Sequence, residues 1–210
     1  MFELVDIHEG LISGFYDIQS NYPHRTEDYF KSLKHNQFKI RTWIYQKFNE
    51  CVKNKKIRSA NIMGSGFAVY DSLLIKHMNL DLVLFYDYDP EVLIINWKIL
   101  NNIRKNILID QRCLDVIFDR DYLRVEAEVV INLSCECMFD FKIIADKGWN
   151  KDTIFCLVGS NKNDKGNINV HGSLDEFVRS TGLKSILYSG EMNIENNETK
   201  YLVIGGKDGI

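Results

Sequence analysis

A short glycine turn is the first stretch of this sequence whose residue types could do chemistry. Gly64, Ser65 and Gly66 follow an apolar run over residues 60–63. Glycines let a backbone come close to phosphate oxygens because no side chain blocks the approach, and the Ser65 hydroxyl can donate a hydrogen bond to the same oxygens. The three residues therefore predict a phosphate-binding turn that joins a strand to a helix.

A pair of polar residues stands at the start of the next apolar run. Asn79 and Asp81 are two positions apart, where the run 80–86 begins. Side chains at i and i+2 of a strand project to the same face, so both could reach one metal ion. Carboxylate and carbonyl oxygens are the protein ligands of Mg2+. The pair therefore predicts a metal-holding strand.

Taken in order, the Gly-Ser turn and residues 78–85 (Met-Asn-Leu-Asp-Leu-Val-Leu-Phe) resemble the signature of the DNA polymerase beta-like nucleotidyltransferase superfamily. In that family Gly-Ser ends the first strand and Asp-x-Asp begins the second. The resemblance covers residues 58–146. It implies a compact nucleotidyltransferase that binds a nucleoside triphosphate with Mg2+ and transfers NMP to a hydroxyl on a protein, an RNA or a small molecule. Gly64, Ser65 and Gly66 would bind the nucleotide.

The same resemblance assigns the metal-binding and catalytic residues. Asp81 takes the second position of Asp-x-Asp, Asn79 takes the first, and a third carboxylate follows on a later strand. Asp140 is favoured as the third carboxylate, because it follows a β-meander as in polymerase-type members. It would also act as the base. Asp115, placed as in minimal antitoxin-like members, is the rival. For either residue the plainer alternative is a strand aspartate that faces solvent.

Asn79 decides whether such a site would be active, and the sequence leaves that open. Its carbonyl can ligate a metal but brings no charge, so metal affinity should drop. The chain is then a pseudo-enzyme, an enzyme that uses other carboxylates, or a variant in which an aspartate was replaced. The alternative function is a non-catalytic pseudo-nucleotidyltransferase that acts as a protein-interaction module, antitoxin-like or viral regulatory.

The elements that position these residues follow from hydrophobic periodicity. The predicted fold class is α/β (α+β), with an N-terminal helix and a small C-terminal α/β extension, and the resemblance implies a nucleotidyltransferase palm-like mixed sheet flanked by helices. Three parts are expected: 1–57 (N-terminal arm and helix), 58–148 (core) and 149–210 (extension). Expected strands are 58–63, 78–86, 112–118, 123–131, 137–144, 153–158, 185–189 and 200–204. Helices are expected from Thr26 and over 69–74, 91–107 and 173–181, after an arm or short strand in 1–24.

Composition sets further limits. The 210 residues are 45% apolar with a net charge of -3, as in a globular chain, and the charge gives no support to wholesale nucleic-acid binding. Five cysteines without zinc spacing predict reduced thiols. No apolar run approaches the roughly 20 residues that span a bilayer, and the N-terminus lacks the features of a signal peptide. We therefore expect a cytoplasmic protein with no membrane partner.

Overall fold

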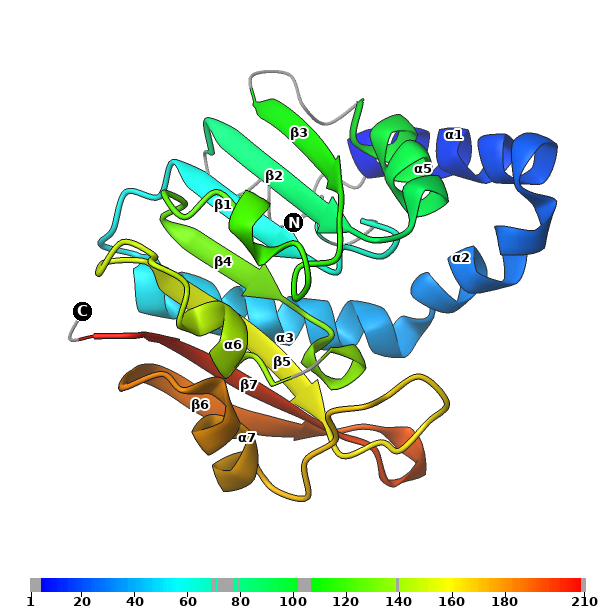
Figure 1. Ribbon diagram of the computed structural model, residues 1–210. Coiled ribbons are helices and arrows are strands. Elements are labelled where there is room, and N and C mark those ends of the chain that lie inside the picture. The colour runs from blue at the N-terminus through cyan, green and yellow to red at the C-terminus, as the bar shows by residue number, and fades with distance from the viewer. Residues whose placement is uncertain are drawn as a thin grey trace.

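The seven described strands form one sheet in the structure, a computed structural model (Figure 1). It describes residues 5–68, 71, 78, 80–101, 107–138 and 140–208, so Asn79 and most of the expected helix 69–74 lie outside the described residues. The strands are β1 (Ser59–Met63), β2 (Leu82–Asp87), β3 (Leu108–Cys113), β4 (Val129–Asn132), β5 (Ile154–Ser160), β6 (Ser185–Asn193) and β7 (Thr199–Gly206).

The order across the sheet is β3-β2-β1-β4-β5-β7-β6. Strands β1 to β5 pair in parallel, and β7 runs antiparallel between β5 and β6. The chain therefore starts in the middle of the sheet, moves outward to β3, and returns to the other side of β1. In open α/β sheets, ligands bind beside such a reversal of strand order, at the carboxyl ends of the strands.

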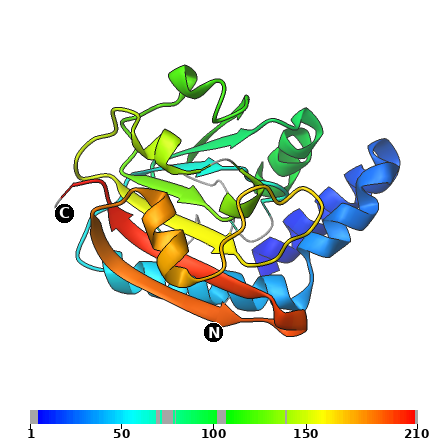
Figure 2. The same cartoon turned by 60° about the horizontal axis from the view of Figure 1, so that its bottom comes forward.

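Helices cover both faces of the sheet. α3 (His35–Val52) crosses behind β4 and β5, whereas α6 (Lys142–Ala145) and α7 (Leu174–Thr181) lie in front (Figure 1). α1 (Val5–Asn21), η1 (Pro23–Arg25) and α2 (Thr26–Ser32) form an N-terminal arm, and α1 packs against α5 (Pro90–Asn101). Figure 2 shows this arm extending beyond the sheet. Among the described residues, no helix is long and apolar enough to cross a membrane.

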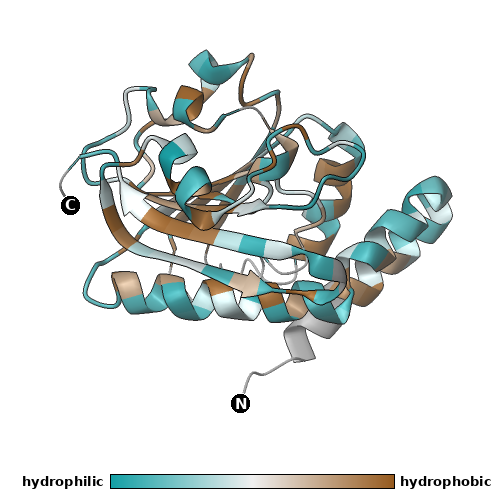
Figure 3. Cartoon of the chain, turned by 90° about the horizontal axis from the view of Figure 1, so that it is seen from below, coloured by the Kyte–Doolittle hydropathy of each residue, from teal (hydrophilic) through white to brown (hydrophobic). Residues whose placement is uncertain are grey.

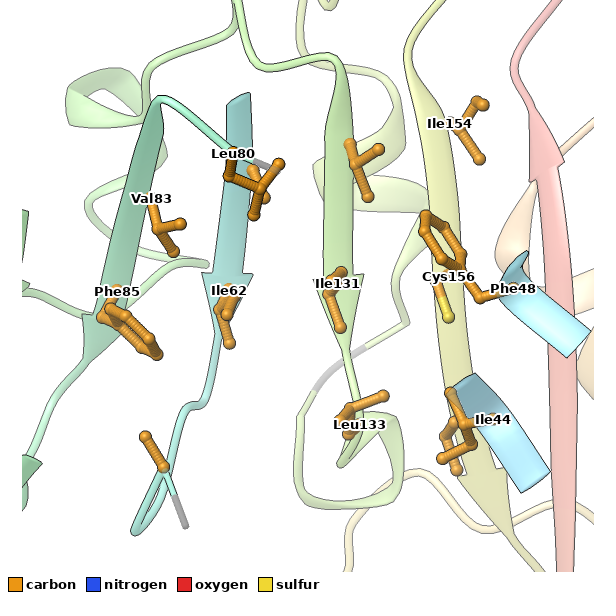
Figure 4. Packing of buried hydrophobic residues seen from close by; sticks show 14 of the residues in the cluster. Ile44, Phe48, Ile62, Leu80, Val83, Phe85, Ile131, Leu133, Ile154 and Cys156 are labelled. Atoms are coloured by element: carbon orange, nitrogen blue, oxygen red, sulfur yellow. The ribbon is translucent and has the colours of Figure 1, made fainter. Parts of the chain in front are cut away.

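The core between α3 and the sheet follows from the sequence of that helix. Ile40, Ile44, Phe48 and Val52 recur at four-residue steps, share one face and are all buried. They pack against apolar side chains of β1, β4 and β5 (Figure 4). Each such burial contributes about 1.5–3 kcal/mol. Figure 3 shows hydrophobic and hydrophilic segments alternating along α3, as expected for a helix with one buried face.

The C-terminal part of the chain folds as its local signals predict. The Ser173 hydroxyl accepts a hydrogen bond from the Glu176 N–H and caps α7, and Gly182 ends that helix with a φ of +70°. β5 lies where the strand 153–158 was expected. β6 and β7 lie where the strands 185–189 and 200–204 were expected, and they pair antiparallel across a loop that contains η4 (Glu195–Asn197).

The α/β class is confirmed, but the palm-like fold is wrong. The expected antiparallel meander does not form, because β3 and β4 belong to the parallel part of the sheet. Residues 137–144 include the end of η3 (Cys135–Cys137) and most of α6 instead of a strand. Phe141, Ile144 and Ala145 are buried there at three- and four-residue spacing, which suits a helix. α1 is a helix, where an irregular arm or a short strand was expected in residues 1–24.

Candidate functional site

A cavity of about 540 Å³ opens at the carboxyl ends of β1, β2 and β3 and extends past the end of β4. It lies at the reversal of strand order, where β1 is flanked by β2 and β4. One side is formed by the turns after β1, β2 and β3, and the other by η3 and the loop after β5. The lining residues are Arg25, Gly64, Gly66, 86–89, Val92, 114–117, Ser134, Cys137, Met138 and 165–168.

The turn after β1 needs glycine at two positions. Gly64 has a φ of +60° and Gly66 a φ of +50°. This left-handed backbone costs other residues about 1–2 kcal/mol each. The Gly64 N–H donates to the Tyr86 carbonyl at 2.9 Å, which ties the turn to the end of β2. At Gly66 a Cβ would meet no atom within 4 Å, so the backbone is accessible from the cavity there, whereas the Met138 side chain packs on Gly64.

Asp87, the last residue of β2, holds this turn through its carboxylate. Oδ2 accepts hydrogen bonds from the Gly66 N–H at 2.9 Å and from the Ser65 hydroxyl at 3.4 Å, and Oδ1 accepts from the Asp89 N–H at 3.0 Å. Burial raises the pKa of the Asp87 carboxyl above its usual 3.8, and the two backbone donors partly oppose this shift. Asp87 therefore places a largely buried acceptor in the cavity wall.

Asn96 of α5 fixes the same turn from the other side. Its Nδ2 donates to the Gly66 carbonyl at 2.6 Å and to the Ser65 hydroxyl at 3.3 Å, and its Oδ1 accepts from the Ala68 N–H at 2.8 Å. The side chain is fully buried. Because a buried amide that loses a partner is costly, these contacts lock the glycine turn to α5.

Asp89 connects the cavity to the N-terminal arm. Its Oδ1 accepts from the N–H groups of Glu91 and Val92 at 3.0 and 3.4 Å, at the start of α5. Its Oδ2 pairs with Arg25 Nη1 at 2.6 Å. The Arg25 guanidinium also lies 5.6 Å from the centre of the Phe67 ring. A cation from η1 thus lies beside the acids that follow β2.

An apolar wall stands next to these acids. Tyr88 is 78% exposed and lines the cavity together with Leu114, Val116 and Ile117. Asp115 shapes this wall, since its Oδ1 accepts from the Ile117 N–H at 2.8 Å. A wall of this kind suits a flat apolar ring.

The opposite side of the cavity is formed by η3 and by residues 161–172, which we call the β5 loop. The N–H groups of Ile168 and Asn169 both donate to the Glu136 carbonyl, at 2.8 and 3.0 Å, so the loop is fastened to η3. The Glu136 carboxylate forms a buried ion pair with Lys200 of β7. Asn167 Oδ1 accepts from the Cys137 thiol at 3.3 Å. This side is therefore held by contacts from η3, β7 and the loop itself.

The structure brings only some of the sequence-predicted site residues together. Gly64, Ser65 and Gly66 form the turn after β1, and Gly64 and Gly66 line the cavity, while their assigned role in binding a ligand stays a prediction. Asp81 lies at the amino edge of the sheet, exposed and paired with Arg58. Asp81 and Asp87 are therefore separated along β2 by about 20 Å, six residues at a rise of about 3.3 Å.

The two rivals for the third carboxylate are not brought to Asp81. Asp115 lies at the carboxyl edge, where the neighbouring Leu114 N–H donates to the Asp87 carbonyl at 3.0 Å. Asp140 is exposed on the segment that enters α6, and its Oδ1 accepts from the Lys142 N–H at 3.0 Å. The described residues contain no group of three His, Cys, Asp or Glu side chains that could hold a metal ion.

No family model and no curated protein sequence matches the chain. Solved structures do match. The N-methyltransferase NodS from Bradyrhizobium japonicum WM9, in complex with S-adenosyl-L-homocysteine, matches with a TM-score of 0.59 and 9% identity over 92% of this chain and 98% of that chain. An O-methyltransferase family protein from Burkholderia thailandensis gives 0.62 and 15% over 95% and 72%. The CurJ carbon methyltransferase gives 0.63 and 8% over 97% and 68%.

The fold is that of these methyltransferases. The resemblance to the polymerase beta-like nucleotidyltransferases is therefore wrong, and so is the function it implied, transfer of NMP from a nucleoside triphosphate. The non-catalytic pseudo-nucleotidyltransferase is unsupported for the same reason. Mg2+ or Mn2+ as cofactor is also corrected, because the matching NodS structure holds S-adenosyl-L-homocysteine and the described residues show no metal cluster. Asn79 lies outside the described residues, so its assigned role stays untested.

Sequence reasoning missed the residues that organise the cavity. Asp87, Asp89, Asn96 and Arg25 were not assigned to the predicted site. The signal for Asp87 was present: an acidic residue at the carboxyl end of the strand that follows a glycine turn is typical of adenosine-binding α/β folds. Arg25 gave no such signal, because its partner Asp89 lies 64 residues away in the chain.

Proposed function

We propose that the chain binds S-adenosylmethionine in this cavity and transfers its methyl group to an acceptor. The observation that carries the proposal is the contact between the Asp87 carboxylate and the Gly66 N–H at the reversal of strand order. This contact places the buried acceptor oxygens of Asp87 next to the backbone of Gly66, which carries no side chain. The fold shared with methyltransferases, one of them in complex with S-adenosyl-L-homocysteine, supports the same ligand.

The groups that line the cavity fit the chemistry of S-adenosylmethionine. The Asp87 carboxylate suits the hydroxyl donors of a ribose, and Tyr88 and the apolar wall suit an adenine ring. The turn leaves room for a methionyl chain at Gly66, where a Cβ would meet no atom within 4 Å. Asp89 and Arg25 offer a carboxylate and a guanidinium to the amino and carboxylate groups of that chain.

Bound S-adenosylmethionine would supply a methyl group on a sulfonium. The S–CH3 bond breaks as a nucleophilic atom of the acceptor bonds to the methyl group. A neutral thioether is left, and the acceptor gives up a proton. The chain's own residues hold and orient the two reactants. Asp87 and Asp89 place negative charge near a cationic ligand. The β5 loop and η3 form the opposite side of the cavity. A methyl acceptor would enter on that side and displace water.

Isothermal titration calorimetry with S-adenosylmethionine and S-adenosylhomocysteine tests the proposal. We expect binding of both, and a loss of at least about tenfold in Asp87→Ala, since a hydrogen bond to a charged acceptor contributes about 1.5–3 kcal/mol. Asp121→Ala is the matched control, because Asp121 is an exposed aspartate outside the cavity that pairs with Lys147. Absence of heat with both compounds, from wild-type protein whose circular dichroism shows it folded, would overturn the proposal.

Two expectations from the sequence remain proposals. The division of the chain into 1–57, 58–148 and 149–210 is one, although strands on both sides of residue 148 share one sheet. The cytoplasmic location is the other.

A further inference from the structure

A second cavity, of about 520 Å³, lies against β1 and β2 on the face of the sheet opposite α3. Ala60 and Ile62 belong to the core cluster that includes α3, so Asn61, which lies between them on β1, projects its side chain to the other face. The lining residues are Ser59, Asn61, Leu82, Leu84, Leu123, Arg124, Glu126 and Ala127. The cavity at the glycine turn shares none of them. A space of this size suits a small organic molecule.

The connection from β3 to β4, residues 114–128, leaves this space open. Parallel strands are usually joined through a helix that covers the sheet. All residues of this connection are described, and they form turns and η2 (Arg120–Tyr122), with no α-helix among them. The Arg124 N–H donates to the Tyr86 hydroxyl at 3.2 Å, which fastens the connection to β2. A cavity therefore remains between the strands and the connection.

Asn61 has an unsatisfied acceptor at this cavity. The side chain is fully buried, and its Nδ2 donates to the Arg124 carbonyl at 2.7 Å, which identifies the NH2 end of the amide. Its Oδ1 is buried without a hydrogen-bond partner among the described residues. A buried acceptor without a partner is costly, so a ligand that donates an N–H or O–H group to Asn61 Oδ1 gains affinity.

The rest of the lining combines an apolar surface with two opposite charges. Leu84 and Leu123 are buried, whereas Arg124 and Glu126 are exposed, which puts both charges at the opening of the cavity. A carboxylate pairs with the Arg124 guanidinium, and an ammonium pairs with the Glu126 carboxylate. An α-amino acid carries both groups on one carbon atom. Its ammonium also supplies the N–H donor that Asn61 Oδ1 lacks.

We propose that this second cavity binds a free α-amino acid with a large apolar side chain. The ammonium donates to Asn61 Oδ1 and pairs with Glu126, the carboxylate pairs with Arg124, and the apolar side chain packs against the leucines of the lining. The residues that β1 and β2 contribute come from the amino-terminal halves of these strands. The site is therefore separate from the carboxyl ends of the strands and does not depend on the proposed function.

Isothermal titration calorimetry with L-phenylalanine tests the proposal, and two analogues are the matched ligands. 2-Phenylethylamine lacks the carboxylate, and 3-phenylpropanoate lacks the ammonium. We expect L-phenylalanine to bind and 2-phenylethylamine to bind about fivefold more weakly, because the partner of Arg124 is missing. 3-Phenylpropanoate should bind at least about tenfold more weakly, because it leaves Asn61 Oδ1 without a donor and brings a second carboxylate toward Glu126.

Four variants assign the binding to this cavity. Asn61→Leu keeps the approximate size of the side chain and removes the acceptor, so L-phenylalanine should bind at least about tenfold more weakly. Arg124→Gln and Glu126→Gln change exposed side chains, should each weaken binding about fivefold, and serve if Asn61→Leu does not fold. Arg120→Gln is the control, because Arg120 is an exposed arginine on η2 that lines neither cavity.

The outcomes separate this inference from the proposed function. Folded wild-type protein that binds no L-phenylalanine, or that binds it and both analogues alike, overturns the inference. Unchanged affinity for L-phenylalanine in Asn61→Leu, or in both Arg124→Gln and Glu126→Gln, overturns it too. Binding of S-adenosylhomocysteine is measured on the same proteins and should stay within about twofold of wild type in all four variants, since the two cavities share no lining residue.

Discussion

Replacing Asp87 by asparagine is the sharpest single perturbation of the candidate site. The carboxylate offers two acceptor oxygens, which take the Gly66 N–H at 2.9 Å and the Asp89 N–H at 3.0 Å. Asparagine offers one acceptor oxygen and one NH2 group, so one of the two backbone donors loses its partner and faces another donor. The change keeps the shape of the side chain, removes its charge and replaces one acceptor with a donor.

The structure gives a magnitude for each effect. One buried donor without an acceptor costs about 1–3 kcal/mol, and removal of a desolvated carboxylate offsets part of it, so we expect a net destabilisation of about 1 kcal/mol. The ligand loses a charged acceptor, which is worth about 1.5–3 kcal/mol, or about tenfold to a hundredfold in Kd. The loss of affinity should therefore exceed the loss of stability.

Two assays on the same protein measure these quantities. Urea unfolding gives the change in stability, and calorimetry with S-adenosylhomocysteine gives the change in Kd. Asp121→Asn makes the same chemical change on an exposed aspartate and should alter neither. An Asp87→Asn variant that binds within twofold of wild type would refute the reasoning, because Asp87 would then not contact the ligand.

Three further predictions concern the turn, the pH dependence and the buried ion pair. Gly66→Ala should lower the stability by about 1–2 kcal/mol in thermal denaturation, since φ is +50° and no atom within 4 Å would clash with the added Cβ; an unchanged midpoint would contradict this account. Affinity for S-adenosylhomocysteine should fall as the pH drops through the raised pKa of Asp87, which lies above 3.8, because the carboxylate accepts hydrogen bonds from hydroxyl groups more strongly than the protonated acid, one of whose oxygens becomes a donor. The stability that Asp87 itself contributes has the opposite sign: it is fully present below pH 3.8 and is lost as the pH rises through the folded-state pKa. Asp87→Asn should show neither trend. Lys200→Met should destabilise by about 3 kcal/mol in urea, because it leaves the Glu136 carboxylate buried without its cation, and Glu136→Gln in the same protein should recover most of the loss.

Local signals were enough to find much of the chain's secondary structure. The stripe from Ile40 to Val52 predicts the buried face of α3, and Ser173 predicts the start of α7. The apolar runs that meet the glycine turn predict β1 and β2. These features depend on residues within a few positions of one another, which is why the sequence alone reveals them.

The family was mispredicted because an apolar run does not indicate at which of its two ends the functional residues lie. β2 has Asp81 just before it and Asp87 at its end, and the resemblance selected Asp81. The parallel pairing of β1 with both β2 and β4 decides between them, since it places the carboxyl ends of these strands together. That pairing joins residues more than twenty positions apart, so local patterns do not specify it.

α5 has a consequence for the dynamics of the whole N-terminal region. The helix holds the glycine turn through Asn96 and begins at Asp89, while its other side packs against α1 so closely that a Cβ on Gly14 would lie 2.8 Å from Ile99 Cγ1. The arm and the cavity therefore share one wall. A ligand that stabilises the turn should suppress local opening of α5, and with it the opening of α1, so that amide hydrogen exchange slows in the arm at a distance from any ligand atom.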